Sequence, residues 1–135
     1  KARETLMGTD ADGNGVRDDL DVYINTTYPN SAKTRAVLQQ TAKALQGAIL
    51  DANDKQKSLQ HAEEDSRAHD CLVYTRPNDF PQISSELEAR VANTDERLRA
   101  YLAYNKQLEG GVFPSASSEA EEKQSCVVNP DSLPN

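Results

Sequence analysis

The sequence predicts an all-α fold, either a helical hairpin or a small helical bundle, with an N-terminal loop and an irregular C-terminal tail. Its apolar residues recur at alternating spacings of three and four, which is the period of one helix face. Sixteen alanines favour helix, because alanine has the highest helix propensity. Only 25 of the 135 residues are Leu, Ile, Val or Phe, so the core is thin. A β-sandwich or barrel is disfavoured, since strands are enriched in β-branched and aromatic residues.

A chain of this length corresponds to one domain, so we expect residues 1–135 to form a single helical domain. Its first helix runs from Arg17 to Tyr28 and ends at the turn-forming pair Pro29-Asn30. The expected parts of the domain are a loop with this first helix (1–28), a long helical hairpin (31–109) and the tail (110–135).

The first arm of the hairpin begins at Ser31, a favourable N-cap residue. Residues 31–75 contain one glycine and no proline, so one uninterrupted helix can form there. The polar stretch 51–58, in which Asn53-Asp54 offers a second cap, can instead divide this arm into two helices. The sequence leaves both arrangements open. The apolar stripe of the arm consists of Val37, Leu38, Ala42, Leu45, Ile49, Ala52 and Leu59.

The second arm follows Arg76-Pro77-Asn78, which ends the first because proline disfavours helix at the residue before it. Asp79 is the expected cap and Pro81 lies in the first turn. We expect a continuous helix over 82–109, closed by Gly110-Gly111. Its stripe consists of Ile83, Leu87, Val91, Thr94, Leu98, Tyr101, Asn105 and Leu108.

The tail differs in composition, since residues 112–135 hold three of the six prolines and several serines. A short helix is possible near Ser118 to Gln124, and the rest is expected to be irregular. The two cysteines, Cys71 and Cys126, match no metal or redox spacing, and we favour a disulfide between them over two free thiols. The disulfide implies a periplasmic or secreted protein and requires the tail to run back along the hairpin.

Composition and motifs exclude several function classes. The formal charge is −7 and the pI is near 4.8, which disfavours nucleic acid as a partner. No apolar run approaches the ~20 residues of a membrane span. The sequence contains no nucleophile elbow, phosphate loop or dinucleotide fingerprint, and no carboxylate is recognisably paired with an apolar pocket, so we expect no enzyme. Because the chain starts at Lys1, we expect that its natural start was removed, by signal-peptide cleavage or by choice of boundary.

The N-terminal loop is the one motif with recognisable chemistry. A hard divalent cation such as calcium binds six to eight oxygens, which side chains on alternate residues of a tight loop can supply. Gly15 occupies the position where the turn needs a left-handed backbone. At Val16 the backbone carbonyl is the expected ligand, so its side chain is expected not to matter. The predicted ligands are Asp10, Asp12, Asn14, Val16, Asp18 and Asp21.

This loop resembles an EF-hand calcium loop, and more closely the single-loop variants of dockerins and of bacterial extracytoplasmic proteins with a DxDxNG core. The resemblance covers about twelve residues and implies Ca²⁺ as the cofactor. Two departures are Asp21 at the last position, where glutamate is common, and Arg17 at a position that is usually apolar. The alternative is a solvated acidic turn whose carboxylates favour the positive end of the following helix.

The preferred functional hypothesis is a non-enzymatic, extracytoplasmic calcium-binding protein in which the ion is a structural clip. The alternative is a periplasmic inhibitor or immunity-type protein that binds a basic partner through an acidic helical surface. Self-association through the hairpin is a third hypothesis. His61, Asp65 and His69 share one helix face but are too spread for a zinc site, so we expect a solvated charged face. Tyr101 and Tyr104 are expected to be core residues with wet hydroxyls.

Overall fold

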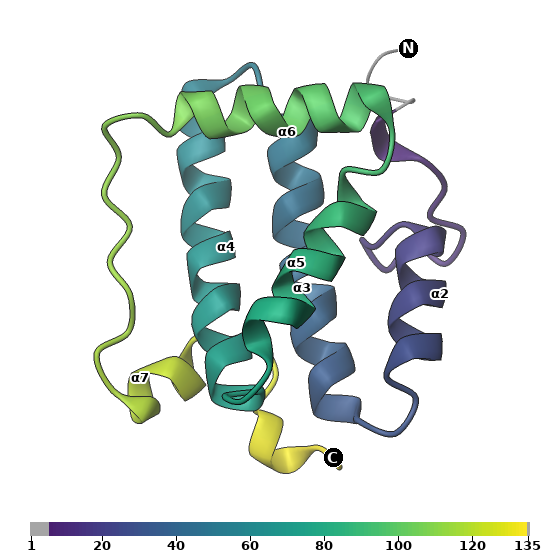
Figure 1. Cartoon of the computed structure of the whole chain (residues 1–135), viewed down its shortest axis with the longest axis vertical. Coiled ribbons are helices and arrows are strands. Elements are labelled where there is room, and N and C mark those ends of the chain that lie inside the picture. Colours follow the sequence, from purple (N-terminus) through teal and green to yellow (C-terminus); the bar gives the residue numbers. More distant parts are fainter. Residues whose placement is uncertain (1–5, 135) are drawn as a thin grey trace.

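The computed structural model describes residues 6–134, and all regular elements within that range are helices (Figure 1). The predicted all-α fold is therefore confirmed. None of the described helices combines the length and the apolar character needed to cross a bilayer. The elements are α2 (Asp18–Thr27), α3 (Ala32–Leu50), α4 (Lys55–Thr75), α5 (Phe80–Val91), α6 (Asp95–Gln107), α7 (Glu119–Gln124) and a 3₁₀ turn, η1 (Pro130–Ser132).

Two helices, α3 and α4, form the antiparallel centre of the molecule (Figure 1). Ser31 caps α3, because its hydroxyl accepts a hydrogen bond of 3.3 Å from the backbone N–H of Thr34. Asp54 caps α4 in the same way, accepting from Lys57 N at 2.9 Å. Of the two arrangements left open for residues 31–75, the structure therefore has the divided one.

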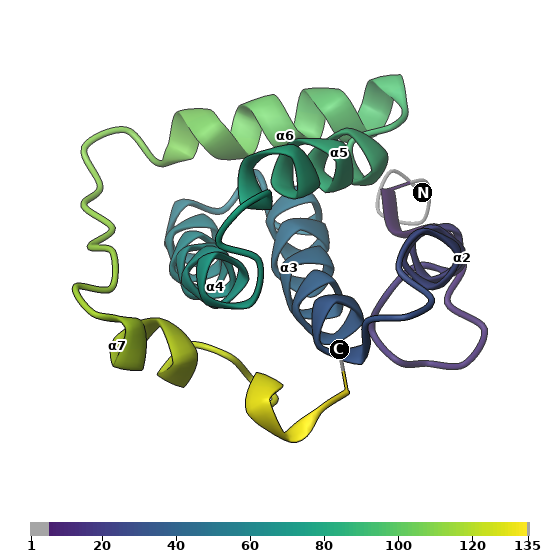
Figure 2. The same ribbon diagram turned by 60° about the horizontal axis from the view of Figure 1, so that its bottom comes forward.

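The second arm differs from the continuous helix expected over 82–109. Helix α5 ends at Val91, and Thr94 caps α6 by accepting a hydrogen bond of 3.1 Å from Arg97 N. After this break α6 turns and lies across the ends of α3 and α4 (Figures 1 and 2). The break changes which residues face inward: Leu98, expected in the apolar stripe, is 45% exposed, whereas Tyr104 is only 2% exposed.

The core lies where α2 and α5 pack on α3, and a second small cluster lies under α6. The main cluster takes its apolar side chains from α2, α3, α4 and α5, with Leu20, Ile24, Leu38, Leu45 and Leu87 among its most buried members. The second cluster is alanine-rich and centres on Tyr104. The small core expected from composition is thus divided into two clusters. The alanines allow the helices around the core to pack closely.

The tail runs back along the bundle, as the disulfide hypothesis required. Cys71 and Cys126 are joined, with their Cα atoms 4.9 Å apart. Ser118 caps the short helix α7, which packs against α4. From there the chain passes to η1 and ends beside the start of α3, where Lys33 N donates to Pro134 O at 3.4 Å (Figure 2).

Candidate metal centre

The acidic loop before α2 closes on itself through its backbone. Asp18 N donates to Thr9 O at 2.8 Å, and Gly13 N donates to Asp10 O at 3.3 Å. Gly15 has φ +88°, a left-handed conformation that a side chain would oppose. The turn that the glycine position predicted is therefore present.

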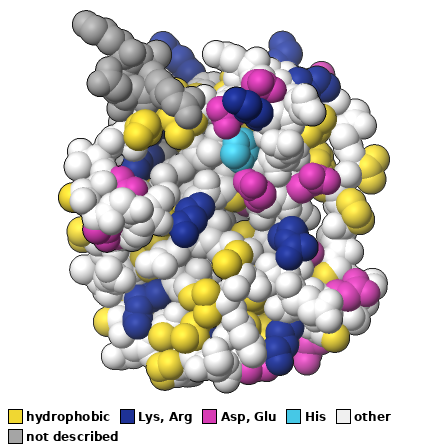
Figure 3. Space-filling view, turned by 180° about the vertical axis from the view of Figure 1, so that it is seen from behind, with side chains coloured by type: hydrophobic (Ala, Val, Ile, Leu, Met, Phe, Trp, Pro, Cys, Tyr) yellow, Lys and Arg dark blue, Asp and Glu magenta, His cyan; other side chains and the backbone are white. Residues whose placement is uncertain are grey.

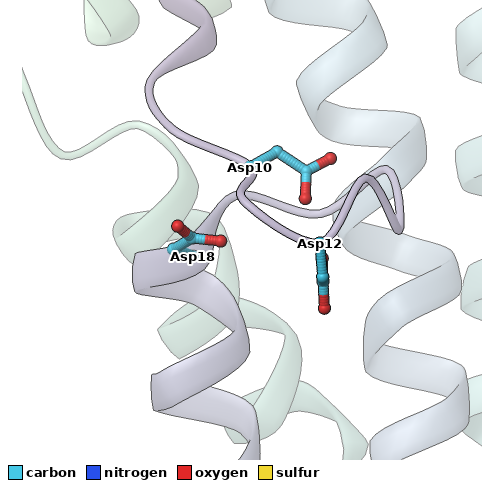
Figure 4. A group of neighbouring side chains, drawn as sticks. All are labelled: Asp10, Asp12 and Asp18. Atoms are coloured by element: carbon cyan, nitrogen blue, oxygen red, sulfur yellow. The ribbon is translucent and has the colours of Figure 1, made fainter.

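Three of the predicted ligands converge in this loop. One carboxylate oxygen from each of Asp10, Asp12 and Asp18 lies within 4.8 Å of the other two. Figure 4 shows Asp10 and Asp12 on the loop and Asp18 on the first turn of α2. Unit charges at this separation repel by roughly 3–4 kcal/mol per pair at the effective dielectric of a protein surface. An acidic group of this kind could hold a metal ion.

Backbone amides orient these side chains. Asp10 Oδ2 accepts from Gly15 N at 2.9 Å, and Asp12 Oδ1 accepts from Asn14 N at 3.1 Å. The Asp18 carboxylate accepts from Ala11 N at 3.0 Å. Amide donors fix the carboxylates in place, but they leave the negative charges of the group without a balancing cation.

The remaining predicted side-chain ligands, Asn14 and Asp21, adjoin the group. Asn14 Nδ2 donates to Asp21 Oδ2 at 2.9 Å, which ties the loop to α2. The other oxygen of Asp21 and one oxygen of Asp10 are buried, and neither has a hydrogen-bond partner in the described part of the chain. Burial raises the pKa of Asp21 from its ordinary value, the hydrogen bond from Asn14 opposes this, and the neighbouring aspartates raise the pKa further.

Two loop residues behave differently from the sequence interpretation. The side chain of Val16, expected not to matter, is 1% exposed and belongs to the main core cluster. It therefore anchors the loop, while the role of its carbonyl as a ligand stays a prediction. Arg17, the apparent compensating charge of the loop, is also 1% exposed and belongs to a different set of contacts.

Arg17 links the loop to the end of α5. Its guanidinium donates to Val91 O at 2.9 Å and to Arg90 O at 3.0 Å. It also pairs with Asp19 through Nε at 2.9 Å, and that hydrogen bond is the main cause of a lowered pKa of Asp19. Arg17 and Asp19 thus pair with each other, and the Arg17 side chain forms no ion pair with the other aspartates of the loop within the described residues.

Gln46 on α3 holds the other side of the loop, a contact that the sequence analysis missed. Its side chain accepts a hydrogen bond from Arg17 N at 3.0 Å and donates to Gly15 O at 3.2 Å. These two hydrogen bonds hold the backbone of the turn that connects the acidic group to α2. Nothing local in the sequence marks a glutamine about thirty positions away as part of the site.

The other titratable groups on α4 do not form the expected solvated face. His61 lies between Asp51 Oδ2, at 2.7 Å, and Glu64 Oε1, at 2.8 Å. Asp65 is half-buried and lines a cavity, where burial raises its pKa to about 6. His69 is exposed, as expected. The expectation that no carboxylate sits in a pocket that raises its pKa is therefore wrong for Asp65, because α5 and α6 cover a position that periodicity on α4 alone leaves open.

Comparison of the chain with protein-family models, curated proteins and solved structures found no match.

Proposed function

We propose that the loop around Asp10 binds one Ca²⁺ and that the protein is a non-enzymatic, extracytoplasmic protein in which this ion acts as a structural clip. The observation that carries the proposal is the pair of buried carboxylate oxygens, one each from Asp10 and Asp21, that have no hydrogen-bond partner among the described residues. Buried polar atoms are almost always paired, so these two require a partner that the described residues do not supply.

The donor set supports calcium over other cations. Every side chain in the group offers oxygen, and no described histidine or cysteine adjoins it, which disfavours zinc and the softer transition metals. Magnesium demands a strict octahedron and keeps its waters, whereas calcium accepts six to eight oxygens in flexible geometry. The proposed ligands are Asp10, Asp12, Asn14, Val16 through its carbonyl, Asp18 and Asp21.

The contacts around the loop indicate what such a clip would do. Gln46 and Arg17 connect the loop to α3 and to the end of α5, so an ion in the loop would stiffen the junction of three helices. The described residues contain a single acidic group of this kind, whereas sensors open a pair of helices. A weak site, with a dissociation constant on the order of 10⁻⁴–10⁻³ M, is expected, as in extracellular modules. The Cys71–Cys126 disulfide supports the same oxidising location.

Calcium titration followed by thermal unfolding tests the proposal. At 10 mM Ca²⁺ and the affinity expected above, ligand linkage stabilises the folded state by about 1.4–2.7 kcal/mol. The Asp10→Ala variant is expected to lose most of this gain. Glu109→Gln removes one exposed charge far from the loop and serves as the matched control, which should keep the full gain.

Two results would contradict the calcium proposal. One is a melting temperature that does not change at 10 mM Ca²⁺. The other is an equal response of Asp10→Ala and the parent protein, because the gain would then come from general screening of a −7 chain and not from this loop.

A partner-binding role is the second candidate, favoured by the outer face of α6. Leu98 and Leu102 lie one turn apart there and are 45% and 57% exposed. Self-association through this face predicts a mass near twice 14.8 kDa by light scattering, and Leu98→Lys should abolish it. The inhibitor hypothesis needs a continuous acidic surface, and on the face seen in Figure 3 acidic and basic side chains are interspersed.

A further inference from the structure

A half-open cavity of about 290 Å³ is lined by residues of α3, α4, α5, α6 and the segment that follows α6. It is separate from the candidate metal centre, because no loop residue lines it. The residues that give the cavity its character are Asp65, His69, Glu88, Tyr104, Leu108 and Phe113.

The polar side of the cavity is negative. Asp65 of α4 and Glu88 of α5 both line it. Ser84 Oγ donates to Glu88 Oε2 at 3.2 Å. Asp65 has no hydrogen bond or ion pair with any described residue. Burial is the main cause that raises its pKa to about 6, the charge of Glu88 adds to it, and His69 opposes it. At neutral pH the cavity therefore contains a partly desolvated carboxylate that has no ion pair with a described residue.

Tyr104 supplies a second, independent unpaired group. Its side chain is 2% exposed and lines the cavity, yet its hydroxyl makes no hydrogen bond within the described part of the chain. Burial raises the pKa of this phenol from its ordinary value, so the hydroxyl stays protonated and available as a donor or an acceptor at neutral pH. Because this side chain lines the cavity, a molecule bound there can supply a hydrogen-bond partner for the hydroxyl.

The cavity is also lined by apolar side chains, among them Leu72, Leu108 and Phe113. A hard metal ion is poorly suited to such a wall, because it needs six or more oxygen ligands and gains nothing from hydrocarbon. An anion is disfavoured by Asp65 and Glu88. A hydrocarbon body with a positive end matches both sides, and aromatic rings such as those of Tyr104 and Phe113 also attract organic cations.

We propose that this cavity binds a small organic amine, with the ammonium group at Asp65 and Glu88 and the hydrocarbon body against Leu108 and Phe113. The cavity volume lies at the lower end of the range for small-molecule sites, which limits the ligand to a compact molecule. The ammonium donates hydrogen bonds to the carboxylates, and its charge offsets their mutual repulsion. Tyr104 lines the same cavity.

The test uses 2-phenylethylamine as the probe, followed by amide chemical shifts of the ¹⁵N-labelled full chain at pH 7.5. The amine is expected to shift the resonances of Asp65, Glu88 and Tyr104. Its neutral analogue 2-phenylethanol and its anionic analogue 3-phenylpropionate are expected to bind at least tenfold more weakly. The measurement is made with and without 10 mM Ca²⁺, so that a failure here is separate from a failure of the metal site.

Two matched variants test whether the charge of Asp65 is what binds the ammonium group. Asp65→Asn keeps the shape of the side chain and removes its charge, and it is expected to weaken the amine at least tenfold. Glu63→Gln, on an exposed position of α4 outside the cavity, removes the same charge and is expected to have no effect. Thermal melts of both variants establish that they are folded.

A pH series adds a third measurement. The titratable groups that face Asp65 are His69 on its own helix, Glu88 on α5 and the two tyrosines, Tyr101 and Tyr104, on α6. Protonation of Asp65 below about pH 6 removes the main attraction, so amine affinity is expected to fall about tenfold between pH 7.5 and pH 5.

Four results would overturn the proposal. They are the absence of shifts with the amine, equal affinity for the amine and the alcohol, undiminished binding by Asp65→Asn, and displacement of the amine by Ca²⁺ or Mg²⁺ with the metal shifting the same cavity resonances. The last result would make the cavity a metal site.

Discussion

Two irregular segments, the acidic loop before α2 and the tail after α6, both lie against the central helices, but they are held in opposite ways. The tail is held by groups that the chain itself provides. A disulfide joins it to α4, and Gln40 of α3 accepts from Val127 N at 2.9 Å and donates to Ser125 O at 3.0 Å. Asp70 accepts from Ala116 N at 3.1 Å. The ion pair within the tail, between Lys123 and Asp131, joins opposite charges.

In the acidic loop, by contrast, charges of the same sign lie together. Its anchors are Val16, Arg17 and Gln46. Carboxylate oxygens of Asp10, Asp12 and Asp18 lie within 4.8 Å of one another, and one buried oxygen each of Asp10 and Asp21 lacks a partner in the described residues. The difference indicates which segment depends on something outside the chain. The charges of the tail are matched within the chain, whereas the like charges gathered in the loop are those that a cation could balance.

The largest expected effect comes from removing the covalent anchor of the tail. The double variant Cys71→Ala, Cys126→Ala opens a loop of 55 residues, which costs about 4 kcal/mol of folding free energy from chain entropy. Thermal unfolding by circular dichroism should show a melting temperature lower by roughly 10–20 °C. Amide exchange should accelerate along the tail, while the response of the acidic loop to Ca²⁺ is retained. A loss under ~1 kcal/mol would show that the polar contacts alone hold the tail.

The next effect tests the internal anchor of the loop. Arg17→Met keeps most of the apolar volume but leaves the carbonyls of Arg90 and Val91 without their donor. Breaking a buried charged contact of this kind costs about 2–4 kcal/mol, measured by urea unfolding. Arg99→Met on the exposed face of α6 is the control and should change stability by less than ~0.5 kcal/mol. Equal losses in the two variants would mean that Arg17 is not the link between loop and bundle.

The helix starts show what could be predicted from sequence. Ser31, Asp54 and Ser118 all cap helices, and each acts on an amide three residues away. Such signals lie within one short window, so they can be read without the fold. The spacing of Asp10, Asp12 and Asp18 is equally local, which is why their convergence could be expected from a tight turn.

The features that sequence could not show depend on distant partners. The break after Val91 interrupts an apolar stripe, and the carbonyls of Arg90 and Val91 at the end of α5 accept hydrogen bonds from Arg17, more than seventy positions earlier. Gln46 reaches the loop from α3, and Asp65 is buried only because α5 and α6 cover it. The periodicity of apolar residues predicts which face of a helix is apolar. It carries no information on which other helix later packs over a given residue.

A smaller effect on stability is expected at the turn between α3 and α4. This turn is a third region in which opposite charges are paired within the chain. Burial acts to lower the pKa of His61, but its hydrogen bonds with Asp51 and Glu64 outweigh burial, so the folded pKa is raised above the ordinary 6.5. The gain in stability is therefore complete below pH 6.5 and is lost as the pH rises through the folded pKa.

The stability difference between the parent protein and His61→Gln, measured by thermal melts, should accordingly fall by about 0.3–1 kcal/mol between pH 6 and pH 9. Glu63→Gln, at an exposed position of the same helix, is the control. Since this turn needs no external ion, the fall should be the same with and without Ca²⁺. A pH profile that changes with Ca²⁺ would instead couple the turn to the acidic loop and weaken the distinction between the regions.

The smallest effect is expected at the end of the tail. Asp131 accepts from the Tyr74 hydroxyl at 2.9 Å and pairs with Lys123 at 2.6 Å, all on the exposed surface. Exposed pairs contribute little, so Asp131→Asn should change the melting temperature by no more than about 1 °C while the disulfide is intact. In the Cys71→Ala, Cys126→Ala background the same substitution should have a larger effect, because the polar contacts then hold the tail alone. Equal effects in both backgrounds would mean that the disulfide and the surface pair act independently, and that the tail is attached at separate points instead of as one layer.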